Sequence, residues 1–268
     1  MVEDAQLKTG PLFAAYGPWA VVTGASDGIG RAMATELARE GFSLVLVARR
    51  RAALEELAES LRTRFCVAAR PLVADLSSRS ETARLDLETR DIDVGLLVAA
   101  AGYGASGGFV DASPDTELGM IDVNCRALAQ SVQDFARRFV GRGRGGLVLM
   151  SSLVAFQGVP GAANYAATKA YVQTLAEGLS VELKGKGVDV LASAPGPVVS
   201  GFGARAGMKI VRGQTPQEVA RGTLRALGRR TTVRPGFLAK GLEASLAPLP
   251  RYFRARIMGR VMAGLIGG

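Results

Sequence analysis

Apolar runs alternate with segments of helical periodicity along most of the chain. Helical patterns cover residues 30–41 and 51–64 and recur between the later apolar runs. The runs expected to form buried strands are residues 19–24, 43–50, 67–76, 94–102, 145–152 and 187–196. Strands that are apolar on both faces and separated by helices are typical of a parallel sheet. We therefore predict an α/β protein with a doubly wound parallel sheet and helices on both of its faces.

The same pattern predicts a single domain across residues 1–268. No linker interrupts it before about residue 200, so residues 17–200 are expected to form the core and residues 201–268 an extension. Within the extension, Thr215 and Glu218 have the spacing of a capping box, which predicts the start of a helix.

A glycine-rich turn follows the first expected strand. Gly24, Gly28 and Gly30 lie between that strand and the first helix. Glycines at such places let the chain turn tightly, let the backbone approach a pyrophosphate and let the helix pack on the strand. The helix N-terminus also offers free N–H groups and a positive dipole end to phosphates. The pattern predicts a Rossmann-like dinucleotide site, with a plain glycine-rich loop as the alternative.

Arginines follow the second expected strand. NAD-binding sites usually carry an acid about 20 residues beyond the glycines, where it binds the ribose 2′-hydroxyl. Here Arg49, Arg50 and Arg51 stand in that place. An arginine suits a 2′-phosphate because it forms charge-assisted, often bidentate hydrogen bonds. This favours NADP(H) over NAD(H), with an exposed basic start to a helix as the alternative.

Cysteine content and charge indicate the compartment and the partners of the protein. Two cysteines, Cys66 and Cys125, are too few for a disulfide framework, and the first ten residues lack the apolar core of a signal peptide, so we expect a cytoplasmic protein. The net charge of +9 is uneven. From Arg205 onward there are thirteen Lys and Arg against two acids. Such a surface favours an acidic or phosphorylated partner, with a solvated arginine-rich face as the alternative.

The chain contains no histidine, so a general acid or base must come from another residue type. Tyr165 and Lys169 are four residues apart and would share one face of a helix. A free tyrosine titrates near ~10. A neighbouring ammonium and an oxidised nicotinamide both favour the phenolate and lower that pKa. The pair alone is a weak signal, since this spacing arises often by chance.

Together, several motifs resemble the short-chain dehydrogenase/reductase family, in the branch near 3-oxoacyl reductases and hydroxysteroid dehydrogenases. They are the turn Thr23-Gly24-x-x-x-Gly28-x-Gly30, Ser152 thirteen residues before Tyr165, Lys169, and the PGPV segment from Pro195. The resemblance covers about residues 19–200 in order. It implies a hydride transfer between a nicotinamide and a carbonyl or secondary alcohol.

The resemblance also implies residue roles. Tyr165 would be the general acid and base, Lys169 would lower its pKa and bind the nicotinamide ribose, and Ser152 would hold the substrate oxygen. Asn124 would help a water connect Lys169 to solvent. The cofactor-binding residues would be Gly24, Ser26, Asp27, Gly28, Ile29, Gly30, Arg49, Arg50, Asp75, Leu76, Ala101, Gly102, Tyr165, Lys169, Pro195, Gly196, Val198 and Ser200. No metal is expected.

One position departs from the family pattern. The family commonly has Asn-Asn-Ala-Gly after the fourth strand, whereas this chain has Ala99-Ala100-Ala101-Gly102. The asparagines brace the central sheet and line the adenine–ribose side of the cofactor. Losing them costs about 1 kcal/mol per hydrogen bond if nothing replaces it.

The extension is where the family places a mobile loop and helices over the substrate. The glycines of residues 201–213 fit a lid. Further on, the apolar residues at helical spacing are Phe253, Ile257, Val261 and Leu265, widened by Met258 and Met262. Arg256 and Arg260 fall on the other side. Such a helix could pack on the domain or a partner subunit, contact a membrane, or form a greasy substrate entrance.

Our reading is an NADP(H)-dependent carbonyl reductase or alcohol dehydrogenase. The expected partners are a small carbonyl or acyl thioester and other copies of the chain in a homodimer or homotetramer, with no nucleic acid. A membrane-associated lipid reductase acting on 3-oxoacyl or steroid substrates, with peripheral contact through the C-terminal segment, is one alternative. A non-catalytic NADP-binding sensor is another, supported by the altered residues 99–101.

Overall fold

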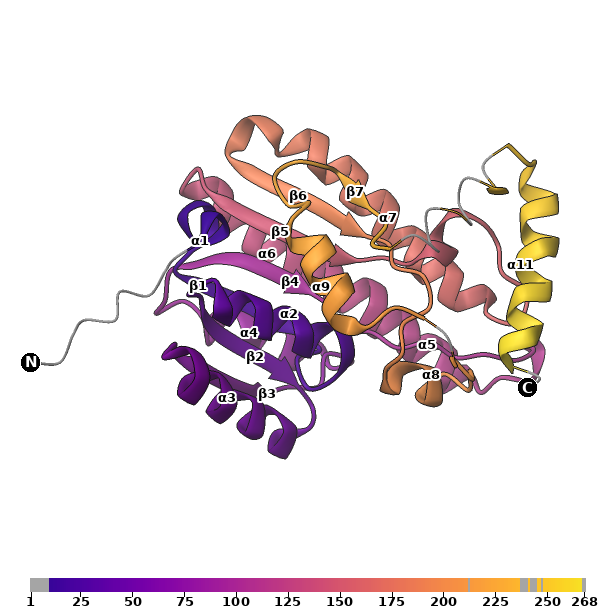
Figure 1. Cartoon of the computed structure of the whole chain (residues 1–268), viewed down its shortest axis with the longest axis horizontal. Helices are drawn as coiled ribbons and strands as arrows, with labels where there is room; N and C mark the ends of the chain where they lie inside the picture. The colour runs from indigo at the N-terminus through magenta and orange to yellow at the C-terminus, as the bar shows by residue number, and fades with distance from the viewer. Residues whose placement is uncertain (1–9, 212, 237–240, 242–244, 247, 267–268) are drawn as a thin grey trace, which may run out of the picture.

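The computed structural model describes residues 10–211, 213–236, 241, 245–246 and 248–266. A seven-stranded parallel sheet runs through its middle in the order β3-β2-β1-β4-β5-β6-β7 (Figure 1). The strands are β1 (Trp19–Thr23), β2 (Ser43–Ala48), β3 (Ala69–Val73), β4 (Val94–Ala99), β5 (Gly145–Met150), β6 (Val188–Ser193) and β7 (Thr232–Val233). The predicted single parallel sheet is confirmed. β7 was not predicted, because two residues give no periodicity.

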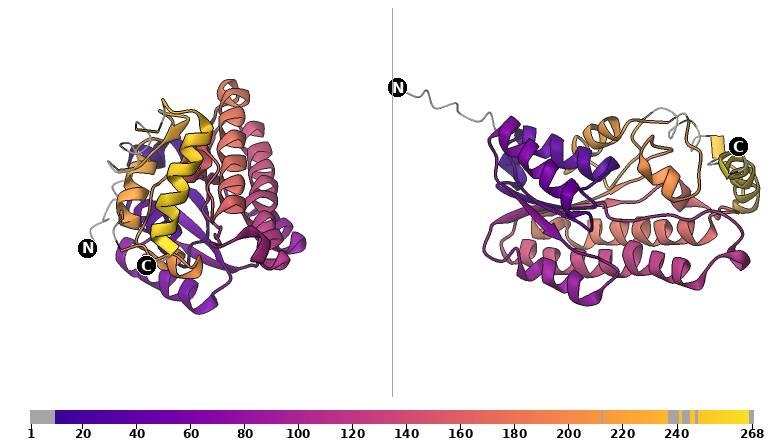
Figure 2. Two further views of the ribbon diagram at one scale, coloured as in Figure 1. Left: turned by 90° about the vertical axis from the view of Figure 1, so that its right-hand side faces the viewer. Right: turned by 90° about the horizontal axis from the view of Figure 1, so that it is seen from below.

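Helices cover both faces of the sheet (Figure 2). One layer contains α1 (Pro11–Tyr16), α2 (Gly28–Arg39), α3 (Arg51–Phe65) and α9 (Pro216–Leu224). The opposite layer contains α4 (Arg79–Leu87), α6 (Leu128–Gly141) and α7 (Ala163–Glu182). Each layer of helices covers its own hydrophobic core. Consecutive strand residues point alternately into the two cores, so Val22 packs under the first layer and Val21 under the second.

A partly buried side-chain hydrogen bond joins the N-terminal helix α1 to β6. The Tyr16 hydroxyl donates a hydrogen bond to an Asp189 carboxylate oxygen at 2.6 Å. Burial is the main cause of the raised pKa of Tyr16, and the Asp189 carboxylate adds to it. Helix α9 begins as predicted, with a capping box in which Thr215 and Glu218 satisfy each other's backbone N–H groups.

All of the remaining elements except η4 (Lys184–Lys186) lie beyond the carboxyl ends of the strands. They are η1 (Phe109–Asp111), α5 (Pro114–Ile121), the π-helical turn η2 (Asp122–Ala127), η3 (Leu153–Phe156), η4 (Lys184–Lys186), α8 (Gly201–Arg205) and α11 (Arg251–Ile266). Of these, η4 is the exception, since it precedes β6. In the part of the chain that the structure describes, every helix is too short or too polar to cross a bilayer.

Helix α11 forms where helical spacing predicts it, and of the predicted apolar face only Phe253 and Val261 are largely exposed, while the other four residues pack against the protein. Phe253 and Val261 are 54% and 40% exposed, whereas Met258 and Met262 are each 4% exposed. The helix approaches the protein closely at Gly259, where an added Cβ would lie 3.1 Å from Pro160 Cγ. The helix therefore turns its methionine side, and not its aromatic side, to the protein.

Candidate active site

The site is built at the point where the strand order reverses. β1 and β4 are neighbours, and the chain leaves them toward opposite sides of the sheet, which opens a crevice at their carboxyl ends. A cavity of about 750 Å³ lies there. The segments that follow β1, β2, β3, β4, β5 and β6 all contribute to its lining.

All of the predicted site residues but one line this cavity. The glycine turn contributes Gly24, Ser26, Asp27, Gly28, Ile29 and Gly30, and the segments after β2 and β3 contribute Arg49, Arg50, Asp75 and Leu76. The segments after β4, β5 and β6 and helix α7 contribute Ala101, Gly102, Ser152, Tyr165, Lys169, Pro195, Gly196, Val198 and Ser200. Residues that are spread over most of the chain therefore share one cavity.

The residue outside the lining is Asn124, which is fully buried behind it in the π-helical turn η2. Its amide donates to the Tyr103 carbonyl (2.9 Å) and to the Thr168 hydroxyl (3.0 Å), and its Oδ1 accepts from the Tyr103 N–H (3.1 Å). An added Cβ at Gly102 would lie 2.8 Å from Asn124 Oδ1 and 3.6 Å from Lys169 Nζ. Asn124 thus joins helix α7 to the loop after β4.

The glycine turn is packed too closely for side chains. A Cβ at Gly30 would lie 2.3 Å from the Gly24 carbonyl oxygen, and one at Gly24 would lie 2.8 Å from the Ala100 carbonyl oxygen. Gly24 and Gly28 also have φ values of 70° and 54°, which L side chains rarely adopt. The turn therefore presents bare backbone to the cavity at the start of α2.

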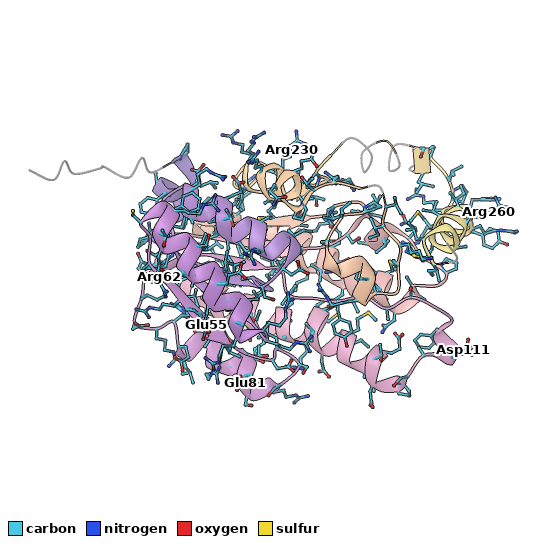
Figure 3. The ribbon with its side chains drawn as sticks, turned by 60° about the horizontal axis from the view of Figure 1, so that its bottom comes forward. Glu55, Arg62, Glu81, Asp111, Arg230 and Arg260 are labelled. Carbon is cyan, nitrogen blue, oxygen red and sulfur yellow. The ribbon has the colours of Figure 1, made fainter. Side chains whose placement is uncertain are left out.

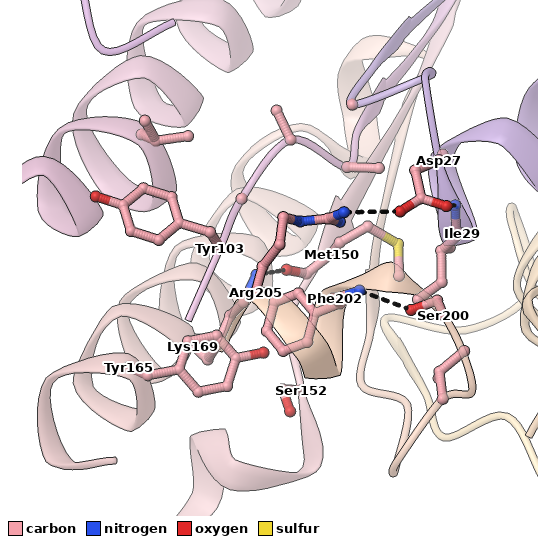
Figure 4. Close-up of a pocket in the computed structure, with 18 of the residues that line it drawn as sticks. Asp27, Ile29, Tyr103, Met150, Ser152, Tyr165, Lys169, Ser200, Phe202 and Arg205 are labelled. Atoms are coloured by element: carbon pink, nitrogen blue, oxygen red, sulfur yellow. Dashed lines mark hydrogen bonds and ion pairs between the residues drawn. The ribbon is translucent and has the colours of Figure 1, made fainter. Parts of the chain in front are cut away.

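An ion pair joins this turn to the short helix α8. Asp27 caps α2 by accepting from the Gly28 N–H at 2.7 Å, and its other oxygen accepts from Arg205 at 2.9 Å (Figure 4). Burial acts to raise the pKa of Asp27, but the hydrogen bonds from Arg205 and Gly28 outweigh it and hold the pKa below its usual value. Arg205 was not among the predicted site residues, because no motif in the sequence marks the arginine at the end of this short helix.

The arginines after β2 lie at the rim of the same cavity. Arg50 donates to the carbonyl and hydroxyl oxygens of Ser26 at 3.1 Å each, and its guanidinium is 4.0 Å from Asp27. Arg49 lies near Asp75, whose pKa burial would raise but hydrogen bonds from Ser77 and the charge of Arg49 lower. The two guanidiniums therefore stand on either side of the space beyond β2.

Three side chains meet at the inner end of the cavity. Ser152 lies just after β5, beside Tyr165 (Figure 4), and a hydrogen bond between the two side chains acts to lower the pKa of Tyr165. Lys169 Nζ donates to the Met150 carbonyl at 2.7 Å and lies 5.9 Å from the centre of the Tyr165 ring. Helix α7 therefore delivers the tyrosine and the lysine from one face, beside the end of β5.

Burial controls the protonation of this group. Burial raises the pKa of Tyr165 to about 12, and the Ser152 hydrogen bond opposes the rise in part. Burial also lowers the pKa of Lys169 to about 8, although Cys125 acts in the opposite direction. In the protein without ligands, the tyrosine is therefore a phenol at neutral pH and the lysine is mostly an ammonium.

Comparison with known proteins identifies this arrangement. The family model for short chain dehydrogenases matches residues 18–209. A 7β-hydroxysteroid dehydrogenase of Clostridium sardiniense is 35% identical over 185 residues, which cover 69% of this chain and 71% of the relative. The chain belongs to the short-chain dehydrogenase family. It is therefore an oxidoreductase of the family that binds a nicotinamide cofactor.

Two further members of this family show the range of relatives. A very-long-chain 3-oxoacyl-CoA reductase of Danio rerio is 33% identical over 183 residues, which are 67% of this chain but 59% of that protein. A solved short-chain dehydrogenase from Sphingobium yanoikuyae, in complex with NADPH, is 33% identical with a TM-score of 0.78. That match covers 87% of this chain and 94% of the other.

An apolar wall faces the tyrosine, and much of it lies beyond the family match. Phe202 packs against Tyr165 with ring centres 5.6 Å apart. The other apolar wall residues are Tyr103, Val154, Met208, Ile210, Met258, Val261, Met262 and Leu265. Four of these are on α11, so the distant C-terminal helix closes the cavity of this short-chain dehydrogenase. A substrate entrance was one of the roles that the sequence left open for this helix, and its Met258 and Met262 do line the cavity.

The departure from the family's Asn-Asn-Ala-Gly is partly offset by the buried Thr23. Its hydroxyl accepts from the N–H groups of Ala100 (3.1 Å) and Ala101 (3.0 Å), and it faces the Val98 carbonyl at 3.5 Å. The loop after β4 is therefore tied to β1 by a side chain that belongs to β1. The expected loss of bracing hydrogen bonds is not complete.

We predict that Thr23→Val lowers the free energy of unfolding by about 1–3 kcal/mol, because two N–H groups lose their acceptor in a largely buried place. Thr23→Ser keeps the hydroxyl and should stay within about 1 kcal/mol of the original protein. Urea denaturation of the two variants measures the difference. Equal stability of the valine and serine variants would show that the hydroxyl does not brace the loop.

Proposed function

We propose that the protein is an NADP(H)-dependent oxidoreductase that transfers a hydride between the nicotinamide and a carbonyl carbon or secondary alcohol. The observation that carries the proposal is the meeting of Ser152, Tyr165 and Lys169 at the inner end of the cavity lined by the glycine turn. The segment after β5 and one face of α7 bring the three side chains to the same end of the cavity.

In reduction, the Tyr165 hydroxyl donates its proton to the carbonyl oxygen, and in oxidation it removes the proton from the alcohol. Ser152 holds the same oxygen and stabilises negative charge that develops on it. Lys169 supplies positive charge beneath the tyrosine, and Asn124 fixes the turn that faces it. The nicotinamide, when bound, supplies or accepts the hydride.

The pKa of Tyr165 fits its proposed role as the proton donor in reduction. A Tyr165 pKa of about 12 keeps the residue protonated at neutral pH, as a proton donor for reduction must be. Oxidation instead needs the phenolate, which burial opposes. The positive charges of Lys169 and of an oxidised nicotinamide favour that phenolate.

The cavity fits an adenine dinucleotide phosphate. The bare backbone of the glycine turn at the start of α2 suits a pyrophosphate. Asp75 and Leu76 are the residues for the adenine end, and residues 195–198 with Ser200 those for the nicotinamide end. Arg49 and Arg50 suit a ribose 2′-phosphate, and the NADPH-bound Sphingobium yanoikuyae enzyme supports that preference.

The substrate we propose is a bulky apolar ketone or 3-oxoacyl compound, or the matching secondary alcohol. The wall that faces Tyr165 is aromatic, aliphatic and methionine-rich. Flexible methionines adapt to large apolar shapes. The names of the steroid and acyl-CoA relatives agree with this class.

The rival role as a non-catalytic sensor has less support. A module that only binds NADP does not need Ser152 beside Tyr165, and the altered residues 99–101 are braced in part by Thr23. We further propose a cytoplasmic homodimer or homotetramer. Exposed apolar side chains on α5 and α7, such as Leu118 (60%) and Tyr171 (43%), support self-association.

We predict that kcat/KM for oxidation of a secondary alcohol with NADP⁺ rises with pH between pH 6 and 8, approaching about tenfold per pH unit. The reason is that the reaction needs the Tyr165 phenolate, which burial makes scarce. Reduction of the ketone should not rise in this range. Initial rates across the pH range measure both, and a flat oxidation profile would contradict the assignment.

The control for this prediction is Tyr165→Phe. It should lower turnover in both directions by about 10²–10⁴-fold, because the proton donor is gone, while NADPH binding stays. Retained turnover would mean that another group moves the proton.

We predict that NADPH raises the melting temperature more than NADH at equal concentration, with a Kd about tenfold or more lower, because a charge-assisted hydrogen bond stabilises the 2′-phosphate. Arg49→Ala with Arg50→Ala should remove the difference. Arg51→Ala is the matched control, since Arg51 lies one residue further and pairs with Glu55 on the surface of α3. An equal or reversed thermal shift would contradict the preference.

We predict that an NADPH-oxidation screen over 3-oxoacyl thioesters, ketosteroids, aldehydes and quinones finds the highest kcat/KM among the bulky apolar ketones. Met262→Trp should fill the wall and lower that value about tenfold or more while small aldehydes keep theirs. Ala263→Trp, one residue along on the exposed side of α11, is the control. Equal effects of both variants on all substrates would show that the wall does not select size.

A further inference from the structure

Helix α11 has an exposed side that nothing in the catalytic site uses. It consists of Arg251, Tyr252, Phe253, Arg256 and Arg260, which we call the outer face. Tyr252 and Phe253 are 65% and 54% exposed, and their rings meet edge to face with centres 5.5 Å apart. Two neighbouring aromatic side chains are therefore exposed to solvent, although the opposite side of the same helix is buried.

The outer face is also uniformly basic. The sequence contains no Asp or Glu after Glu243. Among the described residues, no carboxylate forms an ion pair with Arg251, Arg256 or Arg260. Arg256 instead donates to the Tyr252 hydroxyl at 3.0 Å and lies over its ring. The arginines therefore keep their charges free for an external partner.

The opposite side of α11 is fixed to the protein. Met258 and Met262 are buried against the cavity, Gly259 packs on Pro160, and the Leu265 carbonyl accepts from the Lys209 N–H at 2.9 Å. Figure 2 shows the helix laid across the end of the molecule, and Figure 3 shows Arg260 at that end. The helix is thus held with its basic, aromatic side turned outward.

We propose that the outer face of α11 docks on the surface of an anionic lipid bilayer, with the helix lying in the plane of the membrane. Arginines attract anionic headgroups, and Tyr and Phe side chains settle at the boundary between headgroups and acyl chains. An amphipathic helix of this composition needs no spanning segment to bind.

A second copy of the chain fits the outer face less well. In a two-fold contact the same surface meets itself, so Arg256 and Arg260 would face the arginines of the other copy. Like charges brought together in an interface cost free energy. Phosphate-bearing headgroups, in contrast, complement every charge on this side of the helix.

Docking would set the substrate cavity against the membrane. Met258, Val261, Met262 and Leu265 line the cavity from the inner side of the same helix. Delivery of an apolar substrate from the bilayer rests on the proposed function, whereas binding to the bilayer does not. The experiment therefore measures binding, and the Tyr165→Phe variant should bind vesicles as well as the original protein does.

The test is flotation of the full-length protein with vesicles of phosphatidylcholine alone or mixed with phosphatidylglycerol. We expect flotation with the mixed vesicles and its loss at high salt. Arg256→Glu with Arg260→Glu should lower the partition coefficient about tenfold or more. Tyr252→Ser with Phe253→Ser should lower it as well. Arg229→Glu with Arg230→Glu changes the net charge equally on an exposed turn after α9 and should leave binding unchanged.

Three outcomes would overturn the proposal. They are no flotation with anionic vesicles, an equal loss in the Arg229 and Arg230 control, and self-association in solution that depends on Tyr252 and Phe253. The last would assign the face to a second copy of the chain. An NADPH-induced thermal shift in each variant shows that it is folded.

Discussion

The rest of the site depends on how closely the turn after β1 packs on itself and on the loop after β4. At Gly30 an added Cβ would lie 2.3 Å from the Gly24 carbonyl oxygen, and at Gly24 it would lie 2.8 Å from that of Ala100. This packing fixes the start of α2 against the end of the sheet. Thr23 then ties the second loop to the first, so the cavity has a rigid base.

At the inner end of the cavity, burial shifts the pKa values of the ionisable side chains more than charge pairs do. Tyr165 and Lys169 are pushed toward their neutral forms by the same desolvation, one pKa upward and the other downward. Ser152 offsets part of the penalty for the tyrosine, and the Met150 carbonyl receives the lysine. A chain without histidine can therefore keep a proton donor and a nearby cation side by side at neutral pH.

Much of the fold and of the site could be predicted because it is local or repetitive. Buried parallel strands are continuous apolar runs, and the glycine turn, Ser152, Tyr165 and Lys169 stand at fixed places relative to them. The two-residue strand β7 and the wall from α11 could not be predicted in the same way. They depend on tertiary packing, which leaves Met258 buried and Phe253 exposed on the same helix. The roles of the site residues remain proposals.

The contact between Asp27 and Arg205 gives the cavity a form of thermodynamic linkage. It joins the turn that caps α2 to the helix that carries Phe202 over Tyr165. A ligand at the turn that altered this contact would be coupled to a substrate that contacts α8, because linkage between two sites is reciprocal. Arg205 and Asp27 are 52% and 33% exposed, so such a pair contributes at most about 1 kcal/mol. Cooperativity carried by this contact alone is therefore limited to about fivefold.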